Sequence, residues 1–186
     1  EDVTTQITLT GSDPEGASLT FTKASDPSHG SVSLSGATAT YTPNADFNGS
    51  DSFTFTVSDG QLTSSAATVS ITVTGANDAP SFTKGSDQTV NEDAGAQTVN
   101  GWATDISAGP ADESGQTLTF TVMNSNNALF LSQPSIDASG TLTYSLVANV
   151  SGVATVTVKL QDNGGAANGG VDTSAEQTFT LTVNGV

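Results

Sequence analysis

The sequence has 186 residues, and its 3 basic side chains against 19 acidic ones give a formal net charge of −16. So few basic residues exclude a nucleic-acid-binding protein, because contacts with phosphates need Lys and Arg. The absence of cysteine excludes disulfides and Cys-based zinc sites, and no apolar run is long enough to form a membrane-spanning helix. An acidic protein of one or two domains remains.

Apolar and polar residues alternate along most of the chain, which is typical of strands with one buried face. In the first part, the alternation is clearest over residues 6–10, 19–22, 53–57 and 69–73. In the second part, it predicts strands over about 86–90, 97–104, 116–123, 128–133, 140–146, 153–161 and 176–184. Turn residues separate these runs, and no helical period is sustained. The pattern therefore predicts an all-β protein of antiparallel Greek-key β-sandwiches.

The sequence contains one pattern twice. Residues 49–60 have their counterpart in residues 152–164, and both segments end in a strand followed by an Asp-containing turn. A short linker with Pro80 lies between the copies, and proline ends the preceding strand. We therefore predict two tandem domains, 1–79 and 80–186. The second has longer turns, and the first lacks a counterpart of the second domain's first strand.

Many acidic residues lie at strand ends beside Gly, Pro or Asn rather than on strand faces. In the first copy they are Glu1, Asp2, Asp13, Glu15, Asp59 and Asp78. In the second copy they are Glu92, Asp93, Asp105, Asp112, Glu113 and Asp162. Calcium takes about six to eight oxygen ligands from carboxylates, amides and carbonyls. Turns of this composition therefore indicate Ca²⁺ sites wherever several of them converge.

Several of these segments resemble a known family. Asn77-Asp78-Ala79-Pro80 is similar to the acidic linker of cadherin repeats, and Asp13-Pro14-Glu15 resembles their Asp-x-Asp turn. Val57-Ser58-Asp59-Gly60 is similar to their Ala-x-Asp segment, and residues 41–53 resemble the cadherin-like repeats of large bacterial surface and secreted proteins. The resemblance implies two tandem cadherin-like, Ig-like β-sandwich domains.

The geometry of that family implies which acids meet. Its early glutamate faces the C-terminal joint of a domain, whereas the Asp-x-Asp turn and the late aspartate face the N-terminal joint. The resemblance therefore implies a Ca²⁺-binding joint lined by Glu1, Asp2, Asn77, Asp78, Asp105, Asp112, Glu113 and Asp162. It implies weaker half sites at Asp13, Glu15, Asp59, Glu92 and Asp93. Whether Asp105 or the pair Asp112 and Glu113 replaces the acidic turn of the second copy stays open.

The function implied by the resemblance is structural and adhesive rather than enzymatic. We expect an extracellular repeat of a longer bacterial surface chain, in which Ca²⁺ stiffens the joint and supports homophilic or heterophilic protein contacts. The alternative is a carbohydrate-binding module of a secreted polysaccharide-degrading protein. Trp102 could then be a sugar platform, although a place in or near the core is favoured. His29 is the only histidine, and its turn context argues against a catalytic triad.

Overall fold

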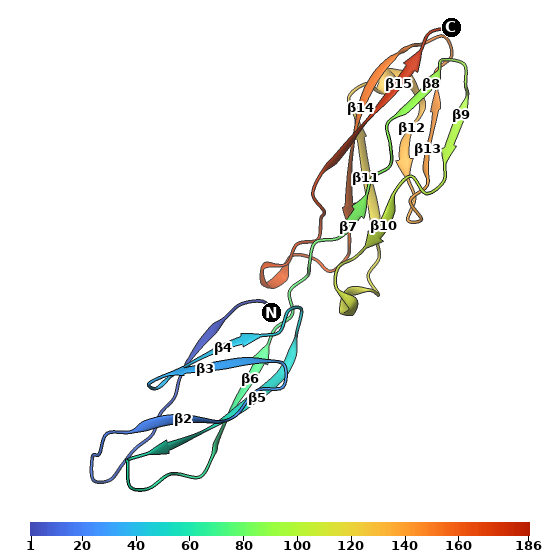
Figure 1. Cartoon of the computed structure of the whole chain (residues 1–186). Helices are drawn as coiled ribbons and strands as arrows, with labels where there is room; N and C mark the ends of the chain where they lie inside the picture. Colours follow the sequence, from blue (N-terminus) through green and yellow to red (C-terminus); the bar gives the residue numbers. More distant parts are fainter. The chain divides into compact units, whose positions relative to one another are not determined.

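The structure is a computed structural model that describes all 186 residues (Figure 1). The chain forms two compact units, Glu1–Gly75 and Ala76–Val186. Residues 76–79 therefore lie with the second unit, although the sequence places the boundary after residue 79. The reason is local, because Asn77 and Asp78 make hydrogen bonds to side chains of the second unit.

The first unit contains six strands in two three-stranded sheets. They are β1 (Thr5–Thr8), β2 (Thr20–Ser25), β3 (Gly30–Ser35), β4 (Thr38–Pro43), β5 (Gly49–Ser58) and β6 (Ala67–Val73). One sheet has the order β1-β4-β3 and the other β2-β5-β6, and all pairs are antiparallel. The alternating side chains of both sheets meet in a small core whose buried members include Tyr41, Phe53 and Phe55.

The second unit contains nine strands. They are β7 (Ser81–Thr83), β8 (Gln88–Asn91), β9 (Ala96–Val99), β10 (Thr104–Ser107), β11 (Thr119–Asn124), β12 (Phe130–Ile136), β13 (Leu142–Leu146), β14 (Gly152–Gln161) and β15 (Gln177–Asn184). The larger sheet has the order β11-β14-β15-β8, and β12-β13-β9 and β10-β7 form smaller sheets. All pairs are antiparallel except β15 with β8, which are parallel. The prediction of an all-β, sandwich-type fold is confirmed.

Two differences from the predicted strands have local causes. The predicted strand over 97–104 is two strands, β9 and β10, because Gly101 has a positive φ of 61° and turns the chain. The short strand β7, which the alternation did not reveal, begins directly after Pro80. Its Phe82 is buried and packs edge-on against Phe120, with 5.2 Å between the ring centroids.

A buried carboxylate stabilises the first unit. The Oδ1 and Oδ2 atoms of Asp51 accept hydrogen bonds from the backbone amides of Ser28, His29 and Ser52 and from the hydroxyl of Tyr41. Burial by itself would raise the pKa of Asp51, but these donors outweigh it and lower the pKa below its usual value. The same burial and the Asp51 carboxylate raise the pKa of Tyr41 to about 12. The charge therefore fixes the turn that precedes β3.

The second unit has the tyrosine without the carboxylate. Asp51 pairs with Ile71 across β5 and β6, and Ala154 pairs with Leu181 at the equivalent place across β14 and β15. Tyr144 is buried as Tyr41 is, but its hydroxyl has no hydrogen-bond partner. The two units thus provide a natural pair of buried tyrosines, one beside a buried carboxylate and one whose hydroxyl has no hydrogen-bond partner.

This pair leads to a prediction about stability. We expect Tyr41→Phe to destabilise the first unit by about 1–2 kcal/mol, because it removes a hydrogen bond to a buried carboxylate. Tyr144→Phe is the matched control, and it should leave the second unit unchanged or slightly more stable because it removes an unpaired hydroxyl. Chemical denaturation monitored by amide hydrogen exchange measures the stability of each unit separately. Equal losses in both variants would contradict this assignment.

Candidate metal centre

Asn77 organises one end of the second unit. Its Nδ2 donates to Oδ1 of Asp162 at 3.0 Å and to the carbonyl of Val171 at 2.7 Å, and its Oδ1 accepts from Nε2 of Gln116 at 2.7 Å. Its backbone carbonyl accepts a further bond from the amide of Val171. A residue that precedes β7 therefore ties together the two long loops at this end.

The glycine-rich loop between β14 and β15 closes around Asn77. A Cβ atom on Gly164 would overlap the Asn77 carboxamide, and one on Gly170 would lie 2.6 Å from the Asn77 backbone nitrogen. The amide of Gly164 also donates to Oδ1 of Asp162 at 2.9 Å. This loop is one of the longer turns predicted for the second domain, and its glycines allow it to approach Asn77 closely.

Asp78 is joined to Glu113 in the same unit. The backbone amide of Asp78 donates to Oε1 of Glu113 at 2.9 Å. Glu113 ends a short 3₁₀ turn, Ala111–Glu113, and its side chain is only 8 % exposed. Gly109 has a φ of 157°, and a Cβ atom there would overlap Oε2 of Glu113. The loop before the turn therefore needs glycine to accommodate this buried carboxylate.

Three oxygen atoms at this end are buried without a hydrogen-bond donor. They are Oε2 of Glu113, Oδ2 of Asp162 and Oε1 of Gln116. Glu113 and Asp162 are 8 % and 5 % exposed, so bulk water has little access to these oxygens. Buried carboxylates without donors are costly unless a cation pairs with them. The carboxylate oxygens of Asp78, Glu113 and Asp162 do not all lie within 4.8 Å of one another.

The pKa of Glu113 is that of a buried carboxylate without a positive charge beside it. Burial is the main reason that the pKa of Glu113 is raised above its usual value. The hydrogen bond from Asp78 acts in the opposite direction, whereas the charges of Asp78, Asp112 and Asp162 raise the pKa further. A divalent cation bound here would offset the electrostatic repulsion between these carboxylates.

Two further predicted ligands of the second unit, Asp105 and Asp112, lie on the surface. Asp105 is exposed on β10 with a φ of 50°, and its Oδ2 accepts a bond from the hydroxyl of Thr104 at 3.3 Å. Asp112 is exposed in the same 3₁₀ turn as Glu113. Of the two alternatives for the acidic turn, the structure joins Glu113 to the linker residue Asp78. Gln116 is a residue that the sequence analysis missed, and no local motif marks it.

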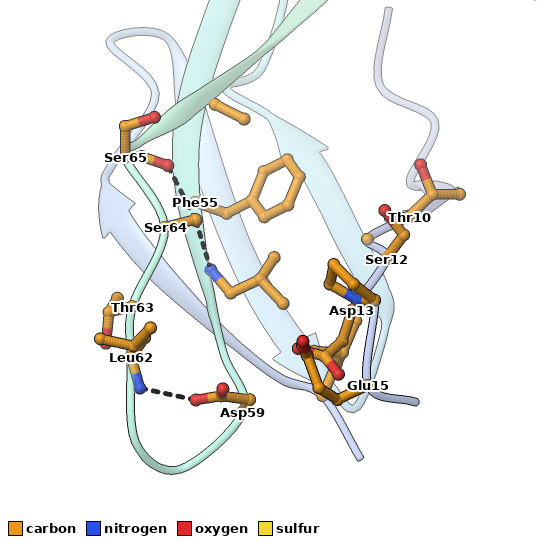
Figure 2. A pocket seen from close by; sticks show the side chains of 15 residues that line it. Thr10, Ser12, Asp13, Glu15, Phe55, Asp59, Leu62, Thr63, Ser64 and Ser65 are labelled. Atoms are coloured by element: carbon orange, nitrogen blue, oxygen red, sulfur yellow. Dashed lines mark hydrogen bonds between the residues drawn. The ribbon is translucent and has the colours of Figure 1, made fainter. Parts of the chain in front are cut away.

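The corresponding acids of the first unit surround an open pocket of about 630 Å³ (Figure 2). Asp13, Glu15 and Asp59 line it together with apolar side chains such as Leu62. Oδ1 of Asp59 accepts from the amides of Gln61 and Leu62, and Oδ1 of Asp13 accepts from Ala17. These bonds cap the turns and lower the pKa of Asp59. Asp13 and Asp59 therefore have donors within the chain.

The Glu-Asp pairs that begin each pattern occupy equivalent places. The Glu1 amino group donates to the carbonyl of Thr74 at 2.6 Å, as the Glu92 amide donates to Asn184 at 2.9 Å. The Asp that follows each Glu is also bonded alike. Oδ1 of Asp2 accepts from the amide of Asp46, and Oδ1 of Asp93 accepts from the amide of Asn149, both at 3.2 Å.

No exposed aromatic residue supports a sugar platform. Trp102 is buried, its Nε1 donates to the carbonyl of Ser86 at 3.0 Å, and its ring centroid lies 4.5 Å from that of Phe179. The large hydrophobic side chains that are exposed are all aliphatic. His29 stacks on Phe47, with 4.3 Å between ring centroids, as part of the turn that Asp51 holds. No helix of the chain is long and apolar enough to cross a membrane.

Comparisons with known proteins agree with this architecture. A family model described as a bacterial Ig domain matches residues 1–72. Two crystal structures of human protocadherin-24 EC1-2 have TM-scores of 0.63 and 0.57 at 17 % and 14 % identity. They cover 97 % and 99 % of this chain and 88 % and 90 % of their own. The chain has a cadherin-like, Ig-like fold. Mouse cadherin-23 EC22-24 is similar over 96 % of this chain and 57 % of its own, with a TM-score of 0.51 and 17 % identity. No curated protein has significant sequence similarity to this cadherin-like chain.

The raised pKa of Glu113 predicts how pH acts on the second unit without divalent cations. A folded-state pKa above the unfolded value means that the folded state binds the proton more tightly. The stability of the second unit should therefore increase as pH falls from neutral through the folded pKa of Glu113. Glu113→Gln should remove this increase and raise Tm at neutral pH by about 2–4 °C in chelator. Glu176→Gln, which removes one exposed charge of the same unit, should retain the pH response.

The packing around Asn77 predicts the effect of a single methyl group. Gly164→Ala should displace the Asn77 carboxamide and destabilise the second unit by about 1–3 kcal/mol. Gly115→Ala is the control, because a Cβ atom there meets open space. Chemical denaturation measures both variants. A neutral Gly164→Ala would show that the loop does not need its close approach to Asn77.

Proposed function

We propose that the chain is a calcium-binding extracellular repeat, and that its principal cation site is the end of the second unit built around Asn77. The observation that supports the proposal most strongly is the set of buried oxygens on Glu113, Asp162 and Gln116 that have no donor. All three are hard oxygen ligands of the kind that Ca²⁺ prefers. In the open pocket of the first unit, by contrast, Asp59 and Asp13 already accept hydrogen bonds within their own turns.

The residues of this site have different roles in the proposal. Asp78, Glu113 and Asp162 would hold the ion through carboxylates, with Gln116 contributing its amide oxygen. Asn77 would act as a positioning residue, because its side-chain groups already bond to Asp162, Gln116 and Val171. Bound Ca²⁺ would supply the positive charge that these buried oxygens lack. Asp105 and Asp112 are exposed, and we assign them outer or supporting roles.

The biological consequence is mechanical. The site includes the residues that enter the second unit from the linker, so a bound cation would fix the linker to the sandwich. Glu1 and Asp2 of the first unit stay predicted contributors to this joint, and Glu92 and Asp93 to a weaker half site. A chain of such repeats would become stiff in Ca²⁺-containing surroundings, which suits a bacterial surface or secreted protein that makes adhesive contacts. The buried position of Trp102 gives the polysaccharide alternative no support.

Calorimetric titration of the full chain with Ca²⁺ tests the proposal. We expect binding in the wild type, a loss of about tenfold or more in affinity for Asp78→Ala and for Asp162→Asn, and no change for the control Glu176→Gln. Ca²⁺ should also raise Tm, because it binds the folded state. Titration of Glu1→Gln and Asp2→Asn shows whether the first unit contributes ligands.

Solution scattering tests the mechanical part separately. Addition of Ca²⁺ should narrow the distribution of molecular dimensions of the wild type, and it should not change that distribution for Asp162→Asn. If the wild type binds no Ca²⁺, or if Asp78→Ala and Asp162→Asn bind it as the wild type does, this site is not the calcium centre. Binding without any change in scattering would retain the site and reject the stiffening.

A further inference from the structure

The outer face of β5 and β6 has a recess of about 380 Å³. Ser50 pairs with Thr72 and Ser52 pairs with Ser70 across these two strands, and all four residues line the recess. Their side chains are exposed, because they alternate along the strands with the inward side chains of the core. The floor of the recess is therefore made of hydroxyl groups.

The wall of the recess is the loop that connects β2 to β3. The pairing of β2 with β5 ends at Thr54, so no strand lies beside the first residues of β5 on this side. Ser28 and His29 take that place, and their backbone amides donate hydrogen bonds to the carboxylate of Asp51. The ring of His29 is also stacked on Phe47, with an angle of 5° between the ring planes. The buried carboxylate and the ring stack therefore fix the wall against the strands.

The polar side chains that line this recess have no hydrogen-bond partner within the chain. These groups are the ring nitrogens of His29 and the hydroxyls of Ser28, Ser50, Ser52, Ser70 and Thr72. Each hydroxyl can donate one hydrogen bond and accept others. The recess therefore presents both donors and acceptors that a ligand could use.

A second hollow provides a comparison. It measures about 270 Å³, lies on β9, β12 and β13 of the second unit, and is also lined by serine and threonine. There the hydroxyl of Ser135 pairs with that of Thr143 at 3.0 Å, and the hydroxyl of Ser145 accepts from the amide of Ser132 at 3.0 Å. Because these groups already bond to each other, the recess of the first unit is the better binding site.

The charge of the lining selects the class of ligand. Asp51 is the only acidic residue of the lining, and no lysine lines it. The two oxygens of Asp51 already accept four hydrogen bonds, so they are not free to bind a cation. The negative charge beneath the floor disfavours an anion. A neutral ligand that carries several hydroxyl groups fits best, and the volume is near the lower end of the usual range for small-molecule sites.

The second unit has different residues at the equivalent places. Val153 stands where the first unit has Ser50, and Ala154 stands where it has Asp51. The second unit therefore lacks one hydroxyl of the floor and the carboxylate that holds the wall. It provides an internal control in any binding experiment on the full chain.

We propose that the recess on β5 and β6 binds a neutral sugar ring, either free or as part of a polysaccharide. Hydrogen bonds between the sugar hydroxyls and the serine and threonine hydroxyls of the floor would supply the affinity, and His29 would contact the ring from the side. The site needs no exposed aromatic platform, because its contacts are hydrogen bonds. It lies in the first unit, so it is independent of the proposed calcium centre in the second.

Titration of the isotope-labelled full chain in chelator, followed by amide chemical shifts, tests the proposal. The probes are the methyl glycosides of glucose, galactose and mannose. We expect saturable shifts in residues 28–29, 50–52 and 70–72 and none in the second unit. Ser52→Ala and Ser70→Ala should each weaken binding by about threefold or more. Ser33→Ala is the matched control, because Ser33 is exposed on β3 of the other sheet.

Further probes distinguish the source and the class of the ligand. Tighter binding of soluble dextran than of methyl glucoside assigns the site to a polysaccharide, and equal binding per ring assigns it to a free sugar. The proposal is overturned if no neutral glycoside and no dextran gives saturable shifts, or if Ser52→Ala and Ser70→Ala bind as the wild type does. A methyl glucuronide that binds as tightly as methyl glucoside overturns the neutral class. Shifts of the same amides that grow with protein concentration, without sugar, overturn the assigned occupant and identify a second copy instead.

Discussion

A carboxylate can be buried in this fold only if donors or a cation balance its charge, and the two units satisfy that constraint differently. In the first unit, Asp51 receives hydrogen bonds from three backbone amides and the hydroxyl of Tyr41, and its pKa is lowered despite burial. In the second unit, Glu113 and Asp162 each have one oxygen without a donor, and the pKa of Glu113 is raised. The first arrangement is balanced by donors within the chain. In the second, no basic side chain pairs with Glu113 or Asp162, so a proton or a bound cation would have to balance their charge.

The position of these groups explains why the second unit includes the linker. Asn77 and Asp78 are held by Asp162, Gln116 and Glu113 rather than by the sandwich that precedes them in sequence. The glycine-rich loop after β14 is long enough to reach Asn77, and its glycines leave room for the carboxamide. A turn for which the sequence predicts only a greater length is therefore part of the candidate site.

Much of the fold follows from the sequence, because alternation and turn residues are local signals. Strands such as β5, β14 and β15 have strict alternation over five or more residues and were located to within a few positions. The short strand β7 and the break at Gly101 were missed, since three residues contain no period and a left-handed glycine resembles any other glycine in sequence. The ligand set of the candidate site stays a prediction. Asp78, Glu113 and Asp162 are placed together at one end of the unit, but Gln116 carries no motif, and the exposure of Asp105 depends on the register of β10 with β7.

The last strands of the two units, β6 and β15, differ in burial because β15 has a neighbouring strand on both sides. The positions of Val69, Ile71 and Val73 have the same alternation as Phe179, Leu181 and Val183, so sequence alone would assign them equal burial. They differ because a sheet edge exposes both its main-chain groups and the rims of its inward side chains until another strand covers it. In the second unit β8 supplies that cover from within the unit, and it does so in parallel, directly before the Glu-Asp pair that the two patterns share. The additional strand beside β15 therefore accounts for the deeper burial of its inward side chains relative to those of β6.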